Sequence, residues 1–222
     1  MKISRLSIAA ILAGLAALVR VIFFTPVEAV QGPAQKIFYV HVSAAWCAFL
    51  AFGLVGLLSA LYLWMRDEKL DRLAESTAEV GTVFTTVVLI TGPLWAKPVW
   101  GTFWTWDARL TLTLFLWFIF VAYMILRGAV DDRALRSRYC AVLGILGALL
   151  VPFIHLSVYM FRTLHPKPIV AKPDRPSLPD EMLLTLAISV VAALIMLGAL
   201  VRARYHYANL RDADVDHGGL NA

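Results

Sequence analysis

Long apolar runs separated by short polar connections dominate the chain. The runs lie near residues 6–25, 38–64, 80–96, 110–127, 139–161 and 181–202. About 20 predominantly apolar residues are enough for a helix to cross the hydrocarbon core of a bilayer. The pattern therefore predicts an all-α, polytopic integral membrane protein with about six transmembrane helices, forming a single transmembrane domain over 1–222. An even number of spans places both termini on the same side of the membrane.

The first apolar run also has the features of a signal peptide. Lys2 and Arg5 precede it, and the small residues around Val27 and Ala29 provide a weak cleavage site. The run nevertheless reaches Phe24, which is long enough to span the membrane. We expect a first transmembrane helix, with cleavage as the alternative.

The positive charges lie in short clusters between the apolar runs and predict the topology. Twelve lysines and arginines fall on the side of the N-terminus: Lys2, Arg5, Arg66, Lys69, Arg72, Arg127, Arg133, Arg136, Arg138, Arg202, Arg204 and Arg211. Eight fall on the opposite side: Arg20, Lys36, Lys97, Arg109, Arg162, Lys167, Lys172 and Arg175. This bias favours both termini in the cytoplasm.

With this topology, a loop near 26–37, a tryptophan-rich segment at 94–109 and a loop at 162–180 face outward. The last loop contains five prolines, which exclude a helix and favour extended backbone: Pro166, Pro168, Pro173, Pro176 and Pro179. The polar tail 203–222 is expected to be cytoplasmic and loose.

Composition excludes several classes of protein. The chain has 222 residues, of which 60% are hydrophobic and 16% are charged, whereas about a quarter are charged in a soluble domain. The net charge of +5 does not indicate nucleic-acid binding, because the cations set topology. Cys47 and Cys140 lie apart within apolar runs, so we expect neither a redox pair nor covalent haem attachment. No nucleotide-binding motif is visible.

Four of the seven tryptophans lie within the tryptophan-rich segment: Trp95, Trp100, Trp104 and Trp106. Tryptophan is common at membrane interfaces, but one or two would suffice for anchoring. Four of them, together with the backbone bends expected at Pro98 and Gly101, favour a surface that holds a flat apolar ligand. Asp107 is suited to cap the fourth helix. Arg109 is unfavourable near a helix start, which suggests an anionic partner such as a haem propionate; Lys97 is a second candidate.

Two histidines are expected at the depth of the tryptophan-rich segment. His41 opens the second run, and His165 lies just past the end of the fifth. Paired imidazoles are axial ligands of haem iron. Zinc is disfavoured, because no third or fourth ligand has suitable spacing. His155 is on the order of 15 Å deeper, where it either packs as a neutral imidazole or serves as a ligand. His206 and His217 are expected to be solvated.

The segment WGTFWTWDARLT at 100–111 resembles the tryptophan-rich (WWD) signature of haem-handling proteins in cytochrome c biogenesis. YVHV at 39–42 and TLH at 163–165 also resemble the family of cytochrome c maturation protein C (haem exporter protein C, CcmC). The resemblance to this family covers nearly the whole chain. Ser43 stands where many members have proline, which alters the helix start rather than the ligand.

The resemblance implies that His41 and His165 are the axial ligands of haem iron. It also implies that Trp95, Trp100, Trp104, Trp106, Asp107 and Arg109 form the outer haem site. The family passes a non-covalent haem b to the haem chaperone CcmE, working with the ABC transporter subunits CcmA and CcmB and the small subunit CcmD. We therefore expect a haem-transport subunit of the bacterial inner membrane rather than an enzyme.

Three other functions compete with this one. An intramembrane cytochrome b-type electron-transfer subunit is weakened, because no second deep histidine accompanies His155. A membrane acyltransferase using His155 lacks a nucleophile and an acceptor site. A plain permease with an aromatic gate is the simplest alternative.

Overall fold

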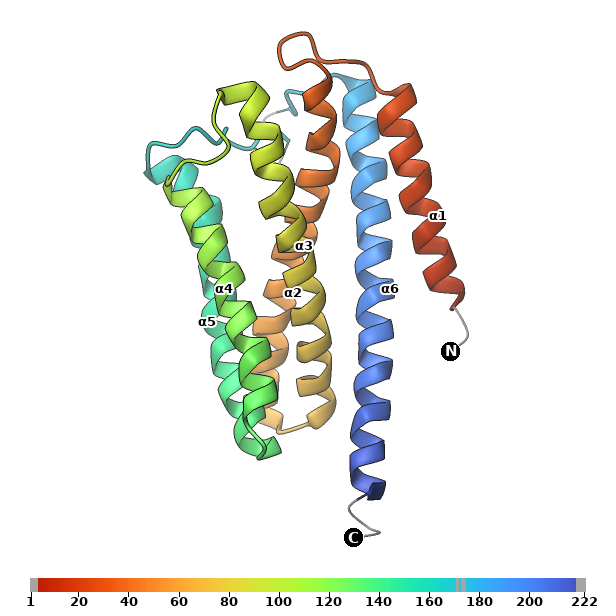
Figure 1. Ribbon diagram of the computed structural model, residues 1–222, viewed down its shortest axis with the longest axis vertical. Coiled ribbons are helices and arrows are strands. Elements are labelled where there is room, and N and C mark those ends of the chain that lie inside the picture. Colours follow the sequence, from red (N-terminus) through yellow and green to blue (C-terminus); the bar gives the residue numbers. More distant parts are fainter. Residues whose placement is uncertain (1–3, 171, 173–174, 219–222) are drawn as a thin grey trace.

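A computed structural model describes residues 4–170, 172 and 175–218 (Figure 1). The described residues form helices and connecting loops, with a single isolated β-bridge between Glu28 and Gly32. The helices are α1 (Arg5–Val19), η1 (Arg20–Phe24), η2 (Pro33–Lys36), α2 (Ile37–Met65), α3 (Glu68–Trp100), α4 (Ala108–Ala129), α5 (Arg133–Met160) and α6 (Asp180–Gly218). Within the described chain, six helical segments are long and apolar enough to cross a membrane. The predicted fold class is therefore confirmed.

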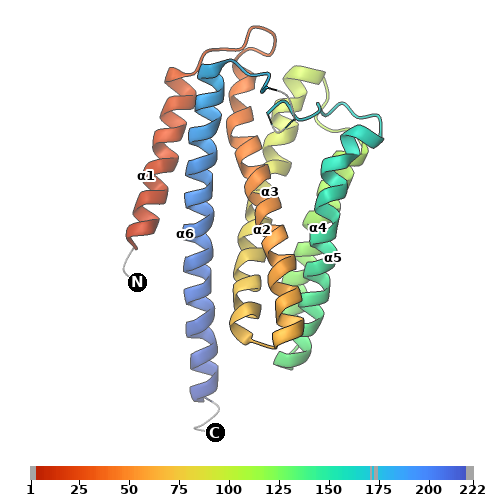
Figure 2. The same cartoon turned by 180° about the vertical axis from the view of Figure 1, so that it is seen from behind.

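The helices run roughly parallel to one long axis. Helices α2 to α5 form a four-helix group, α6 packs against α2 and α3, and α1 packs mainly on α6 (Figures 1 and 2). The α3–α4 connection and the loop between α5 and α6 lie at the same end of the bundle (Figure 1). The turns between α2 and α3 and between α4 and α5 lie at the other end, toward which both termini point.

Aspartate caps begin three of the long helices. Asp107 accepts a hydrogen bond from the backbone N–H of Leu110 at 3.1 Å, so its predicted capping role is confirmed. Asp67 and Asp132 cap α3 and α5 in the same way. At the opposite end of α3, Gly101 has a positive φ of 77°, a conformation that glycine adopts without strain, and it ends the helix directly before the remaining tryptophans.

Two helices extend well beyond the predicted spans. Helix α3 begins at Glu68 rather than near residue 80, and α6 continues to Gly218 rather than ending near residue 202. The expectation that the tail is loose is therefore wrong up to Gly218, while residues 219–222 lie outside the described chain. The added turns are polar, and several of their described charged side chains, such as Glu75 and Arg211, are paired across helices.

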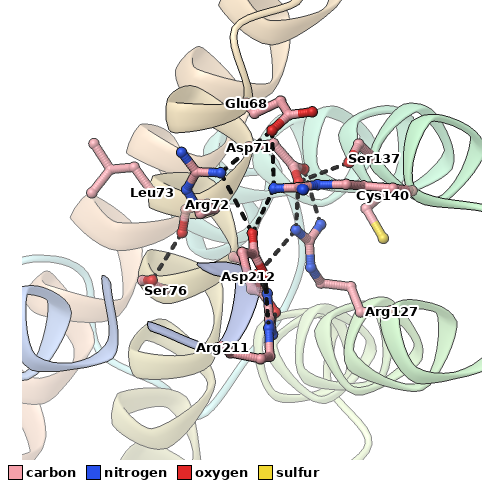
Figure 3. Close-up of polar contacts among 12 residues, drawn as sticks. Glu68, Asp71, Arg72, Leu73, Ser76, Arg127, Ser137, Cys140, Arg211 and Asp212 are labelled. Atoms are coloured by element: carbon pink, nitrogen blue, oxygen red, sulfur yellow. Dashed lines mark hydrogen bonds and ion pairs between the residues drawn. The ribbon is translucent and has the colours of Figure 1, made fainter. Parts of the chain in front are cut away.

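This pairing forms an ion cluster at the end of the bundle opposite the tryptophan-rich segment (Figure 3). Arg127 of α4 contacts Asp71 at 2.7 Å and Glu75 at 3.1 Å, both on α3. Arg211 of α6 bonds Glu75 at 2.8 Å, and Asp212 accepts from Arg133 of α5 at 2.7 Å. The cluster therefore ties α3, α4, α5 and α6 together.

Small residues and stacked rings pack the centre of the four-helix group. Phe52 of α2 and Phe120 of α4 stack with ring centroids 3.8 Å apart. Helices α2 and α5 approach so closely that a Cβ added to Gly56 would collide with Ala148. A Cβ added to Gly144 would lie 2.8 Å from the hydroxyl of Ser59. Both cysteines are free and buried in this core.

The proline-rich loop forms no helix in its described part, in agreement with the prediction. The backbone N–H of Ser177 donates to the carbonyl of Ile169 at 2.9 Å, which folds the loop back on itself. Pro173 lies outside the described residues. The loop leaves α5 at Phe161 and returns to the membrane at Asp180, so it holds His165 over the same end of the bundle as the start of α2.

Candidate functional site

His41 and His165 line the same cavity, although they lie far apart in the sequence. The cavity has a volume of about 800 Å³ and is also lined by Trp95, Trp100 and Arg109. This volume falls within the range of about 300–1,000 Å³ that is typical of ligand pockets. A smaller space of about 70 Å³, lined by both histidines, Arg109 and Trp104, adjoins it. The structure thus brings together most of the residues that the sequence singled out.

A hydrogen bond across two helices sets the tautomer of His41. The ring is buried in the second turn of α2, and its Nδ1 lies 2.9 Å from the hydroxyl oxygen of Thr91 on α3. That hydroxyl donates its only hydrogen to the carbonyl of Val87 at 2.7 Å, so it must accept a hydrogen from His41 Nδ1. The Nε2 atom of His41 therefore carries the free lone pair that a metal requires.

His165 has the same tautomer through a different contact. Its Nδ1 lies 2.9 Å from the backbone carbonyl of Pro166, which can only accept, so Nδ1 is protonated and Nε2 is free. Burial and then the positive charge of Arg109 lower the pKa of His165 from its ordinary value to about 3. The imidazole is consequently neutral at physiological pH, which is the form that binds iron.

Arg109 brings an unmatched positive charge to the two histidines. It lies in the first turn of α4 and lines both the large and the small cavity. Its Nη1 atom is buried without a hydrogen-bond partner among the described residues. A buried guanidinium donor that lacks a partner costs free energy, so its position suits an anionic group entering the cavity.

The four tryptophans of the segment occupy different positions. Trp95 makes an edge-on contact with His41 at 5.9 Å between ring centroids, and its Nε1 donates to the side-chain oxygen of Gln31 at 3.0 Å. Trp100 lines both cavities. Trp104 lines the small cavity, with a buried Nε1 that has no partner in the described chain. Trp106 is 77% exposed and lines neither cavity.

Two other predicted residues also lie outside the cavity walls. Asp107 uses one oxygen to cap α4 and the other to accept from the hydroxyl of Thr105 at 2.8 Å. Lys97, the second candidate for an anionic partner, instead donates to the carbonyl of Gly101 at 2.9 Å. Asp107 therefore shapes the segment that carries Arg109, and Lys97 stabilises the end of α3.

Sequence reasoning missed the residues that support His41 and Trp95. Thr91 orients His41, and Gly92 lets the ring come close, since a Cβ at this position would lie 3.2 Å from His41 Cε1. Gln31 orients Trp95. The sequence signal for this support was a threonine followed by glycine and proline within an apolar run. The sequence does not show that His41 lies opposite this threonine across the helix interface.

Comparison with known proteins gives a consistent result. The family described as "Heme exporter protein C" matches residues 2–216. Heme exporter protein C of Bradyrhizobium diazoefficiens is 38% identical over 73% of this chain and 62% of its own length. The protein of the same name from Haemophilus influenzae is 31% identical over 85% of this chain and 77% of its own length. Heme exporter protein C of Escherichia coli K12 is 37% identical over 64% of this chain and 58% of its own length.

In the first of these relatives the aligned region spans somewhat less than two thirds of the relative's length. The family match nevertheless covers nearly the whole of this chain, including α2, the tryptophan-rich segment and the loop that carries His165. The chain belongs to the haem exporter protein C family.

Proposed function

We propose that this protein binds haem non-covalently at the outer end of its bundle and passes it on during the biogenesis of c-type cytochromes. The observation that carries the proposal is the pairing of His41 and His165 at one cavity, each with Nδ1 protonated and Nε2 free. Two imidazoles are fewer than the three or four protein ligands of zinc sites. They suffice for haem, in which the porphyrin supplies the other four nitrogens.

The remaining walls of the cavity fit the other parts of the haem. Trp95 and Trp100 provide aromatic surface for a flat apolar ring, which is worth about 0.5–1.5 kcal/mol for each well-placed pair beyond burial. The unpaired Nη1 of Arg109 provides a donor for a propionate. Trp104 and the exposed Trp106 extend the aromatic surface beyond the cavity, where a receiving protein would approach.

The proposed partners follow from family membership. We infer transfer to the haem chaperone CcmE and assembly with CcmA, CcmB and CcmD in a bacterial inner membrane, with both termini cytoplasmic. The chain itself contains no nucleotide-binding motif, so ATP hydrolysis falls to the transporter subunits. In this arrangement the protein holds and releases haem without a chemical step of its own.

The visible absorption spectrum of the purified full-length protein tests this proposal. The wild type should show a low-spin, six-coordinate haem that is abolished by either His41→Ala or His165→Ala. His206→Ala, which changes an exposed histidine of α6, is the matched control and should leave the spectrum unchanged. If His155→Ala alone removed the haem while His41→Ala retained it, an intramembrane cytochrome would be the better description.

A further inference from the structure

His155 lines the large cavity but lies deeper in the membrane than the two proposed ligands. It belongs to α5, more than one turn before the helix ends at Met160. Its ring has no hydrogen-bond partner among the described residues, although Tyr159 lies 6.5 Å away between ring centroids. An imidazole left unpaired within a membrane span is costly and is therefore a candidate for function.

The cavity reaches His155 between α2 and α5. These helices are closest where Gly56 meets Ala148 and Gly144 meets Ser59, and they separate toward the outer end (Figure 2). Above this crossing, the cavity is lined by His155 of α5 and by α2 residues that include Val42, Ala45, Trp46 and Phe49. The helices thus diverge along the very stretch that the cavity occupies.

Exposed apolar side chains border this stretch. Trp46 is 37% exposed and lines the cavity. On α5, Phe153 and Leu156 flank His155 in the sequence and are 59% and 47% exposed. The mouth between α2 and α5 is therefore apolar and level with the lipid chains, apart from the imidazole of His155.

We propose that the cavity opens sideways to the bilayer between α2 and α5, and that His155 is a transient haem-binding site at this opening. The proposal rests on the haem-binding function above and adds a route of arrival. A porphyrin dissolved in lipid would enter along the apolar walls, and His155 would supply one axial ligand. At His41 and His165 two imidazoles would hold the iron in place of one, and Arg109 would donate to a propionate.

The rate of haem loading tests the route. Apoprotein in nanodiscs is mixed with phosphatidylcholine vesicles that contain haemin, and the Soret band is followed in time. His155→Ala should slow loading by about tenfold and still reach the six-coordinate spectrum of the wild type. Leu149→Ala, which changes an exposed leucine of α5 that lines neither cavity, is the control and should load normally. Equal rates for His155→Ala and the wild type would overturn the proposal.

A second measurement separates this site from the outer one. A His41→Ala/His165→Ala double variant should bind haem weakly with a five-coordinate spectrum, and adding His155→Ala should remove that signal. A double variant without haem, or a triple variant that keeps it, would overturn the transient site. Failure of the main proposal is distinguishable, because the single His41→Ala variant would then keep the six-coordinate spectrum.

Discussion

At the scale of single residues, hydrogen bonds determine which nitrogen of each histidine is available. The Nδ1–H of His41 donates to the hydroxyl of Thr91 on a neighbouring helix, and the Nδ1–H of His165 donates to the carbonyl of Pro166 in its own loop. His41 is thus held by tertiary packing, whereas His165 is held by local backbone. The two proposed ligands should therefore respond differently to changes around them.

Removing the acceptor of His41 should weaken haem binding without removing the ligand. In Thr91→Val the buried Nδ1–H loses its partner, at a cost of about 1–3 kcal/mol. We expect lower haem occupancy and a higher midpoint potential, because the lost hydrogen bond makes the imidazole less basic. Redox titration of the purified protein measures this shift. Thr91→Ser keeps the hydroxyl and should behave as the wild type; an unchanged potential in Thr91→Val would contradict the role.

Arg109 should contribute to affinity rather than to iron coordination. A hydrogen bond to a charged group is worth about 1.5–3 kcal/mol, so Arg109→Met should raise the dissociation constant for haem roughly 10- to 150-fold. Haem titration followed by absorbance measures this, and the bound haem should keep its six-coordinate spectrum. Lys97→Met, which removes a cation outside the cavity, should have little effect. If Lys97→Met lowered the affinity for haem as much as Arg109→Met, the contribution of Arg109 would be that of a general positive charge.

The sequence predicted the proposed ligands but not what holds them. His41, His165 and Arg109 are polar groups at the borders of apolar runs, so their common depth could be inferred from the spans alone. Thr91 could not be found in this way, because its bond to His41 depends on how α2 and α3 are rotated against each other. Trp106 and Asp107 belong to the same motif, yet the end of α3 at Gly101 directs them away from the cavity walls.

At the scale of elements, hydropathy located the six long helices but misjudged the start of α3 and the end of α6. The first turns of α3 contain several charged residues, which indicate a loop when helices are inferred from apolar length. In the structure Asp71, Glu68 and Glu75 of these turns are paired with arginines of α4, α5 and α6, respectively, so the helix continues. Pairing of this kind needs the tertiary arrangement and is not visible along the chain.

The ion cluster should be important for stability. The side chain of Arg127 is 7% exposed and serves both Asp71 and Glu75. Arg127→Leu would leave two buried carboxylates without this partner, and removing one member of a buried pair costs about 3–5 kcal/mol. We expect a clearly lower midpoint of thermal unfolding in detergent. Arg138→Leu, an exposed arginine on α5, is the control. Equal midpoints for the two variants would show that the cluster adds little stability.

At the scale of the whole molecule, the proposed haem site and the ion cluster lie at opposite ends of the bundle (Figures 1 and 3). Both termini point toward the end with the ion cluster, so the charge bias and the arrangement of helices are compatible with one orientation. In that orientation, the proposed haem site lies outside the membrane, near the tryptophan-rich segment and the proline-rich loop.

Reporter fusions test this orientation. Alkaline phosphatase fused after Lys167 should be active, because this position would be translocated and the enzyme folds only there. The same reporter fused after Asp131, in the turn between α4 and α5, should be inactive. Activity in the second fusion and none in the first would invert the orientation and place both proposed ligands on the cytoplasmic side.

The packing of α1 mainly on α6 has a consequence for biosynthesis. Helix α1 must wait in the membrane until α6 is made, whereas α2 to α5 can associate with neighbours in sequence. Thr185 of α6 then bonds Arg20 at 3.2 Å and Thr25 at 3.1 Å, closing one end of the pair. A chain whose translation stops before α6 therefore leaves α1 without its main packing partner, which would offer membrane proteases a means of recognising unfinished copies.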